Sequence, residues 1–196
     1  MEQQKILWVE DDAVTSLTNL LPPVYFHGGY LVEVASNATD AVNKLMHRIY
    51  DGVVFDIRFP PGSHPLWINL YKRTARGTVE TQLGLSLLYW ALGKKPCVPL
   101  REPHLSALDT LAQQVEELRQ VFPLRDPLSP DKVAIFSIER RLQVTKNGHL
   151  DCLGLTTEQY HQKRITMPDD FLLQILKKHF PYRYQREKYE IDADSS

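Results

Sequence analysis

Two short apolar runs of this 196-residue chain end in acidic side chains. Residues 6–9 are followed by Glu10 and Asp11, and residues 52–55 are followed by Asp56. If both runs are strands of one sheet, their acidic ends can converge at one edge. Three carboxylates at one place repel each other unless a hard divalent cation neutralises them. The spacing therefore predicts a site in which Glu10, Asp11 and Asp56 hold Mg²⁺, so that Asp56 can accept a phosphate group.

The elements expected around these runs would bring them together. Strands that alternate with helices form a parallel sheet through right-handed crossovers, with helices on both faces. The site of such a sheet lies at the carboxyl ends of its strands, where both acidic segments fall. The expected order is a strand at 5–9, a helix at 12–21 capped by Asp12 and ended by Pro22 and Pro23, a strand at 30–35, a helix capped by Asn37, and a strand at 52–55.

The rest of the chain predicts two further strands and a small appended element. Strands are expected at 97–100 and 133–138, and apolar spacing predicts helices at 83–92 and 104–122. The predicted fold class is thus α/β, a doubly wound five-stranded parallel sheet over residues 1–139, with an insertion at about 61–82. Residues 140–196 are predicted to be a C-terminal extension, made of an Asn-Gly hairpin and a short helix at 169–180.

Residues 5–12 (KILWVEDD) and 50–60 (YDGVVFDIRFP) resemble the receiver domain of two-component response regulators, the CheY-like family. In that family the first strand ends in an acidic pair, the third ends in the phospho-accepting Asp, and a Pro follows four residues later. Glu10, Asp11, Asp56 and Pro60 occupy those positions. The resemblance is carried by residues 5–60 and extends to about residue 100.

The resemblance implies that Asp56 takes a phosphoryl group from a histidine kinase or phosphotransfer protein. Glu10, Asp11 and Asp56 would hold Mg²⁺, with the backbone carbonyl of Arg58 as a further ligand. The chain would then be a response regulator of a phosphorelay that signals to an output protein by protein–protein contact, alone or as a homodimer. It would be no enzyme beyond the transfer of a phosphoryl group to its own Asp56.

With the strands assigned as above, two functional positions of the family depart from its pattern. The family has Thr or Ser after strand four, where this chain has Arg101, and Lys after strand five, where this chain has none. Arg101 could point inward and bind a phosphoryl or carboxylate group bidentately, or point outward into solvent. An inward Arg101 would favour a second hypothesis, a pseudo-receiver that is not phosphorylated and acts purely as an interaction module.

Other function classes find less support in the sequence. Asp56-Ile57-Arg58 lacks the second Asp that haloacid-dehalogenase-type phosphatases need as a general acid. Residues 141–160 faintly resemble the opening of a winged-helix domain, which leaves a transcriptional regulator as a third hypothesis. Too few residues follow to complete such a domain, so nucleic acid is not the expected partner.

Composition sets the remaining expectations. Twenty-three basic and twenty-four acidic residues give a net charge of −1, which points to no polyanionic partner. No apolar stretch approaches the ~18 residues of a membrane span. The two cysteines, Cys97 and Cys152, have no metal-ligand spacing around them. Reduced thiols in a cytoplasmic protein are therefore expected.

Overall fold

A computed structural model describes residues 3–15, 17–74, 83–97, 105–138, 148–164 and 166–181 of the chain. One parallel sheet runs through it, with the strand order β2-β1-β3-β4-β5. Its strands are β1 (Gln4–Val9), β2 (Tyr30–Ala35), β3 (Gly52–Phe55), β4 (Val133–Ser137) and β5 (Tyr160–Gln162). This is the order of the flavodoxin-like, doubly wound fold. The predicted fold class is confirmed.

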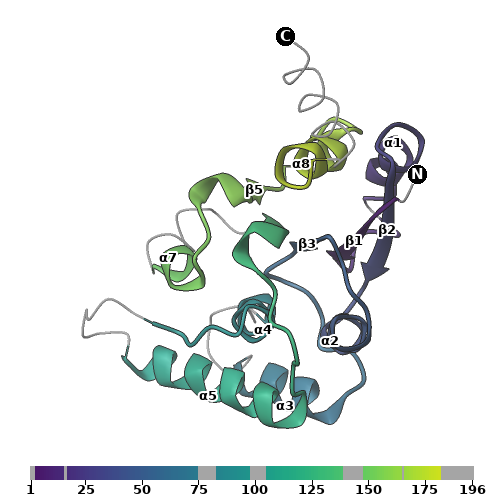
Figure 1. Cartoon of the computed structure of the whole chain (residues 1–196). Helices are drawn as coiled ribbons and strands as arrows, with labels where there is room; N and C mark the ends of the chain where they lie inside the picture. The colour runs from purple at the N-terminus through teal and green to yellow at the C-terminus, as the bar shows by residue number, and fades with distance from the viewer. Residues whose placement is uncertain are drawn as a thin grey trace.

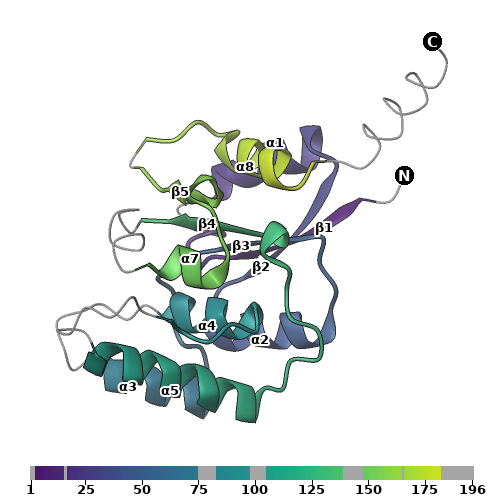
Figure 2. The same ribbon diagram turned by 60° about the vertical axis from the view of Figure 1, so that its left-hand side comes forward.

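Helices cover both faces of the sheet, as Figures 1 and 2 show. On one face lie α1 (Leu21–His27) and α8 (Phe171–His179), packed on alternate side chains of the central strands such as Trp8, Val54 and Phe136. On the other face lie α2 (Ala38–His47), α4 (Leu83–Ala91) and the short α7 (His149–Leu153), packed on the strand side chains that point to that face. The alternation follows from the two-residue period of a strand, and it buries the sheet on both sides.

A further pair of helices, α3 (Pro65–Thr74) and α5 (Leu105–Val121), lies beyond α4 on the side away from the sheet (Figure 2). Every residue of α4 is consequently buried, in agreement with its nearly uninterrupted apolar sequence. Ser86 is its polar exception, and its Oγ donates a 2.6 Å hydrogen bond to Gln114 Oε1 of α5. The helices predicted at 83–92 and 104–122 are thus confirmed, and α3 occupies part of the segment 61–82 expected to be an insertion.

The first predicted helix was placed too early in the chain. Residues around 12–15 form turns, a 3-10 turn spans Thr18–Leu20, and α1 begins at Leu21 with prolines in its first turn. Proline is tolerated there because the first N–H groups of a helix have no intrahelical partner. Pro22 and Pro23 therefore start a helix rather than end one. The second helix, α2, is capped as predicted, with Asn37 Oδ1 accepting from the backbone of Asp40 at 2.9 Å.

The fourth and fifth strands also differ from the prediction. Of the residues 97–100 expected to form strand four, Cys97 lies outside any strand and 98–100 lie outside the described residues. The strand predicted as the fifth is β4, and β5 lies in the segment assigned to the C-terminal extension, paired in parallel with β4 from Ile135↔Tyr160 to Ser137↔Gln162. The sheet therefore continues past the predicted boundary at residue 139.

The C-terminal segment is part of the same core. Leu172, Ile175 and Leu176 of α8 are buried against the sheet, so this helix, expected at 169–180, does not belong to a separate output domain. The predicted hairpin lies mostly outside the described residues, and from residue 148 the chain enters α7. None of the described helices is long and apolar enough to cross a membrane.

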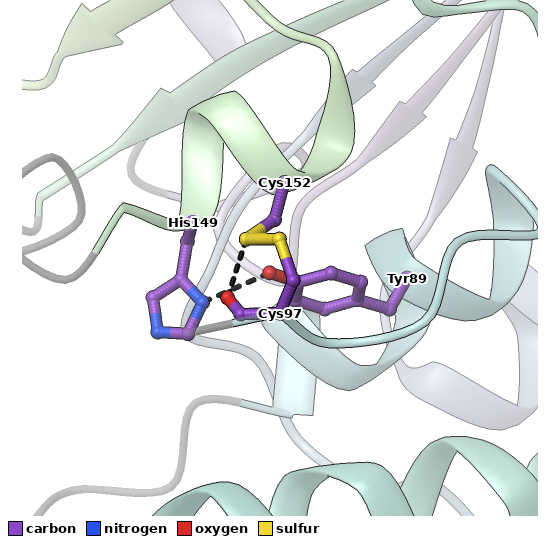
Figure 3. Close-up of a disulfide and its surroundings, with 4 residues drawn as sticks. All are labelled: Tyr89, Cys97, His149 and Cys152. Atoms are coloured by element: carbon purple, nitrogen blue, oxygen red, sulfur yellow. Dashed lines mark hydrogen bonds between the residues drawn. A yellow bond between two sulfur atoms is a disulfide. The ribbon is translucent and has the colours of Figure 1, made fainter. Parts of the chain in front are cut away.

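Cys97 and Cys152 are joined by a disulfide, with their Cα atoms 5.6 Å apart (Figure 3). The prediction of two reduced thiols is wrong for this structure. The two cysteines are 55 residues apart in sequence, and they meet because α7 packs beside the end of α4. No local pattern could have indicated that contact.

Candidate functional site

The ends of β1 and β3 lie level with each other and carry the acidic residues. Val9 pairs with Phe55 in the register of the two strands, and the backbone N–H of Asp56 donates to Val9 O at 2.9 Å. Carboxylate oxygens of Glu10, Asp11 and Asp56 all lie within 4.8 Å of one another. Glu10 and Asp56 are buried, and Asp11 is the least buried of the three. The predicted convergence of the three carboxylates is therefore present in the structure.

Asp56 has a partner on each of its oxygens, from two different strands. Ser137, the last residue of β4, donates from its Oγ to Asp56 Oδ1 at 2.5 Å. The ammonium of Lys163, the residue after β5, lies 2.6 Å from Asp56 Oδ2 and 2.5 Å from Glu10 Oε2. The backbone N–H of Arg58 also donates to Asp56 Oδ1, at 3.1 Å. The candidate site thus combines three carboxylates, one hydroxyl and one ammonium group.

Lys163 is held in place by its own backbone and by an aromatic ring. Its N–H donates to Ser137 O at 2.8 Å, which continues the β4–β5 ladder by one residue. Its Nζ lies 5.6 Å from the centre of the Phe136 ring. Only 12% of the side chain is exposed. Because β4 and β5 are neighbours, Ser137 and Lys163 reach Asp56 from the same edge of the sheet as the acidic residues.

Burial dominates the electrostatics of the carboxylates. Desolvation raises the pKa of Glu10 to about 7, with the nearby charge of Asp56 acting in the same direction and Lys163 opposing both. Desolvation also raises the pKa of Asp11. Burial alone would lower the pKa of Lys163, but the charges of Asp56 and Glu10 more than offset it and leave that pKa raised. Burial is thus the main reason why the pKa values of Glu10 and Asp11 are raised, and the neighbouring charge of Asp56 adds to it.

The amino end of α4 closes over the segment that follows β3. The backbone N–H of Gly84 donates to Ile57 O at 3.0 Å. A Cβ at position 84 would lie 2.3 Å from the carbonyl oxygen of Asp56 and 2.6 Å from Ile57 Cα. Only glycine allows this approach without moving backbone atoms, so Gly84 lets α4 support the loop that carries Asp56.

Two side chains of the site were missed by sequence reasoning. The expectation that the site lacks a hydroxyl and a lysine is wrong. It took residues 97–100 as strand four and 133–138 as strand five, whereas residues 133–137 form β4 and β5 follows at Tyr160–Gln162. Ser137 ends the apolar run 133–137, and that run could have been taken as strand four. For Lys163 the sequence offers little signal, since β5 is only three residues long and polar at two of them. Arg101, the residue expected to replace the hydroxyl, lies outside the described residues.

Comparison with known proteins shows similarity to receiver domains at the level of the fold. The chain matches a CheY-like response regulator receiver domain protein from Methanospirillum hungatei JF-1 at 18% identity, covering 96% of this chain and 99% of that one, with a TM-score of 0.45. It also matches the receiver domain of a sensor histidine kinase from Pseudomonas aeruginosa PAO1, solved with magnesium in its active-site cleft, at 16% identity. That match covers 91% of this chain and 98% of the other, with a TM-score of 0.43.

A bacteriophytochrome response regulator gives a TM-score of 0.47 at 15% identity, covering 93% of this chain and 96% of that one. No family model and no curated protein matches the sequence. Identities this low and TM-scores below 0.5 add nothing to the assignment of individual residues. The strand order and the layers of helices define a CheY-like, receiver-type fold, and the site stands on its own geometry.

Proposed function

We propose that this protein is a divergent response regulator receiver that accepts a phosphoryl group at Asp56. The observation that carries the proposal is the surroundings of that carboxylate. Asp56 ends a central strand and is held by the hydroxyl of Ser137 and the ammonium of Lys163, beside the carboxylates of Glu10 and Asp11. Phosphoryl transfer needs little covalent chemistry from a protein, and it depends on positioned groups that offset the charge of the phosphoryl oxygens.

The donor set fits Mg²⁺. Magnesium prefers hard oxygen ligands and is commonly bound by one or two carboxylates with water completing its shell. Glu10, Asp11 and Asp56 offer such oxygens within 4.8 Å of one another. Bound there, Mg²⁺ would neutralise charge on the transferring group. The backbone carbonyl of Arg58 remains a proposed further ligand.

The roles of the protein groups follow from their positions. An oxygen of Asp56 attacks phosphorus in line with the bond that breaks. A P–O bond forms to Asp56 while the P–N bond of the donor's phosphohistidine breaks, and the imidazole leaves with the electron pair. Ser137 Oγ and Lys163 Nζ, which contact Asp56 at 2.5 and 2.6 Å, then lie beside the new phosphoryl oxygens, to which both can donate.

Acetyl phosphate with Mg²⁺ tests the proposal directly. Intact mass spectrometry is expected to show the addition of one phosphoryl group to the wild type and none to Asp56→Asn. Asp40→Asn is the matched control, because Asp40 is also paired with a lysine at 2.6 Å but lies on the outer surface of α2. Beryllofluoride should raise the melting temperature of the wild type only when Mg²⁺ is present. A wild type that gains neither mass nor stability would contradict the proposal.

One observation favours a second candidate, a pseudo-receiver that acts as an interaction module without phosphorylation. Lys163 contacts Glu10 and Asp56 at the same time, so it already supplies a positive charge to both carboxylates. If the ammonium holds this position too firmly, neither Mg²⁺ nor a phosphoryl group can enter. Lys163→Ala would then gain Mg²⁺ binding that the wild type lacks, whereas the receiver proposal expects the wild type to bind the ion.

The proposed function also implies partners and a cellular location for the protein. A histidine kinase or phosphotransfer protein would act as the donor, and an output protein, or a second copy of this chain, would respond to the phosphorylated form. The chemistry of the protein itself would be limited to phosphoryl transfer to and from Asp56. Because phosphorelay donors draw on ATP, we place the protein in the cytoplasm.

A further inference from the structure

The Cys97–Cys152 disulfide joins α7 to the segment that follows α4, and from α7 the chain leads to β5 and Lys163. Cys97 follows α4, and Cys152 lies within α7 (Figure 3). Their Cα separation of 5.6 Å is within the range in which a disulfide forms without moving the backbone. The bond therefore fits the folded arrangement of α4 and α7.

Both cysteine residues reach the surface of the molecule. Cys97 is exposed and Cys152 is partly buried. A disulfide that solvent can reach is open to exchange with low-molecular-weight thiols, unlike one enclosed in a core. Disulfides in a reducing compartment are usually transient and redox-sensing, and the proposed function places this chain in such a compartment.

The helix that the disulfide holds has little stability of its own. α7 has only five residues, and glycines in the left-handed region flank it, Gly148 at φ 67° and Gly154 at φ 74°. A helix this short does not persist without tertiary contacts. Among the described residues, the buried Leu150 and Leu153 also hold it, as does a 3.0 Å hydrogen bond between Tyr89 Oη and His149 Nδ1, which Figure 3 shows.

From α7 the chain leads directly to the candidate site. Leu155, a 3-10 turn (Thr157–Gln159) and β5 follow, and Lys163 comes immediately after β5. β5 is an edge strand of three residues that pairs only with β4 among the described strands. Gln159 Nε2 also donates to the carbonyl oxygens of Pro130 and Val133, at 2.7 and 2.8 Å. The loss of one anchor should therefore loosen this segment rather than unfold it.

We propose that Cys97 and Cys152 form a reversible redox site that controls how firmly Lys163 is held on Asp56 and Glu10. In the oxidised form α7 is fixed to the segment that follows α4, and the chain from α7 to β5 keeps Lys163 in place. In the reduced form α7 loses this covalent anchor and is held less firmly, and Lys163 spends more time away from the two carboxylates. The redox state of the cysteines thereby sets the charge that Asp56 experiences.

The exchange needs a thiol reductant of the glutathione class. Its thiolate attacks the Sγ atom of Cys97, the more exposed of the two residues, the S–S bond breaks, and Cys152 leaves as a thiolate that takes up a proton. A second reductant molecule attacks the mixed disulfide, which releases Cys97 as a thiol and the reductant as its own disulfide. Two electrons and two protons pass to the protein, and two reductant thiols are oxidised.

The test measures how readily the Lys163 amine reacts with acetic anhydride in the full chain, before and after reduction. Acetylation is quantified by peptide mass spectrometry relative to Lys44. Lys44 is a suitable internal reference because it is also paired with a carboxylate at 2.6 Å and partly buried, but it lies on α2, far along the chain from α7. We expect the ratio of Lys163 to Lys44 modification to rise several-fold on reduction.

The double variant Cys97→Ser/Cys152→Ser should show the high ratio without reductant and no further change with it. An unchanged ratio in reduced wild type would overturn the proposal. A parallel rise of both lysines would also overturn it, because the disulfide would then stabilise the whole fold rather than act on Lys163. The assay uses no phosphoryl donor, so its outcome is separate from that of the acetyl phosphate experiment.

Discussion

The replacement of Lys163 by methionine tests the electrostatic account of the site most directly. The side chain has a similar length and keeps its apolar contacts, but it loses the ammonium that faces Glu10 and Asp56 at 2.5 and 2.6 Å. Each contact corresponds to a Coulomb attraction of about 6 kcal/mol at an effective dielectric constant of about 20, and desolvation of the three charges offsets much of it.

The net loss of unfolding free energy is therefore better estimated from other cases in which one partner of a buried ion pair is removed. Glu10 and Asp56 have almost no exposed side-chain surface, so both would lose their ammonium partner while buried, and Glu10, whose pKa is already about 7, would tend to take up a proton. Such truncations cost about 3–5 kcal/mol in unfolding free energy. Because a domain has about 5–15 kcal/mol in total, the variant is expected to be much less stable at pH 7.

Urea denaturation followed by tryptophan fluorescence measures this loss, since Trp8, Trp67 and Trp90 are all buried and report on the core. Lys44→Met is the matched control. Lys44 lies 2.6 Å from Asp40 on the surface of α2, where an i,i+4 pair stabilises by only about 0.3–0.5 kcal/mol. If Lys163→Met costs no more than Lys44→Met, the ion pairs at the site do not stabilise the fold and the reasoning is refuted. Added Mg²⁺ should restore stability to Lys163→Met more than to the wild type.

Three further substitutions test other parts of the site. Burial raises the folded-state pKa of Glu10 from 4.5 to about 7. Between these pH values the folded state binds more protons than the unfolded state, so the unfolding free energy falls as pH rises, by up to about 3 kcal/mol. Glu10→Gln in metal-free buffer should remove this slope from denaturation curves, and an unchanged slope would contradict the assignment. Ser137→Ala removes the hydrogen bond to Asp56 and should lower the unfolding free energy by about 1.5–3 kcal/mol in urea titrations, with no measurable loss as the contrary result. Gly84→Ala places a Cβ against the backbone of Asp56 and Ile57 and should lower the unfolding free energy by about 1–3 kcal/mol, despite the better helix propensity of alanine. A higher melting temperature for this variant would show that the close approach is wrong.

The sequence determined the first half of the sheet and the acidic half of the site. Residues 5–9, 30–35 and 52–55 carry their strand signals locally, as short apolar runs bounded by charge or glycine. Once these strands alternate with helices, right-handed crossovers leave only a parallel sheet, and Glu10 and Asp56 must fall at the same edge. The local spacing of residue types therefore sufficed to place the carboxylates together.

Two other features could not be decided from residue types alone. α1 begins at the two prolines that were expected to end a helix, because its N–H groups there need no partner. Cys97 and Cys152 meet only because α4 and α7 pack side by side. The prolines fit either the end or the start of a helix, and the two cysteines fit either free thiols or a disulfide, so residue type alone did not decide either feature.

Lys163 shows this division most clearly. β5 is too short to have a periodicity of its own, and it forms a strand because β4 offers a free edge to pair with. The pairing continues through the backbone of Lys163 to Ser137, and this contact brings the ammonium to Asp56 across 107 residues of sequence. Strand ends with an acidic residue can be found from the sequence because their signal is local. The groups that complete the site cannot, because a three-residue edge strand takes its structure, and its register, from its neighbour in the folded sheet.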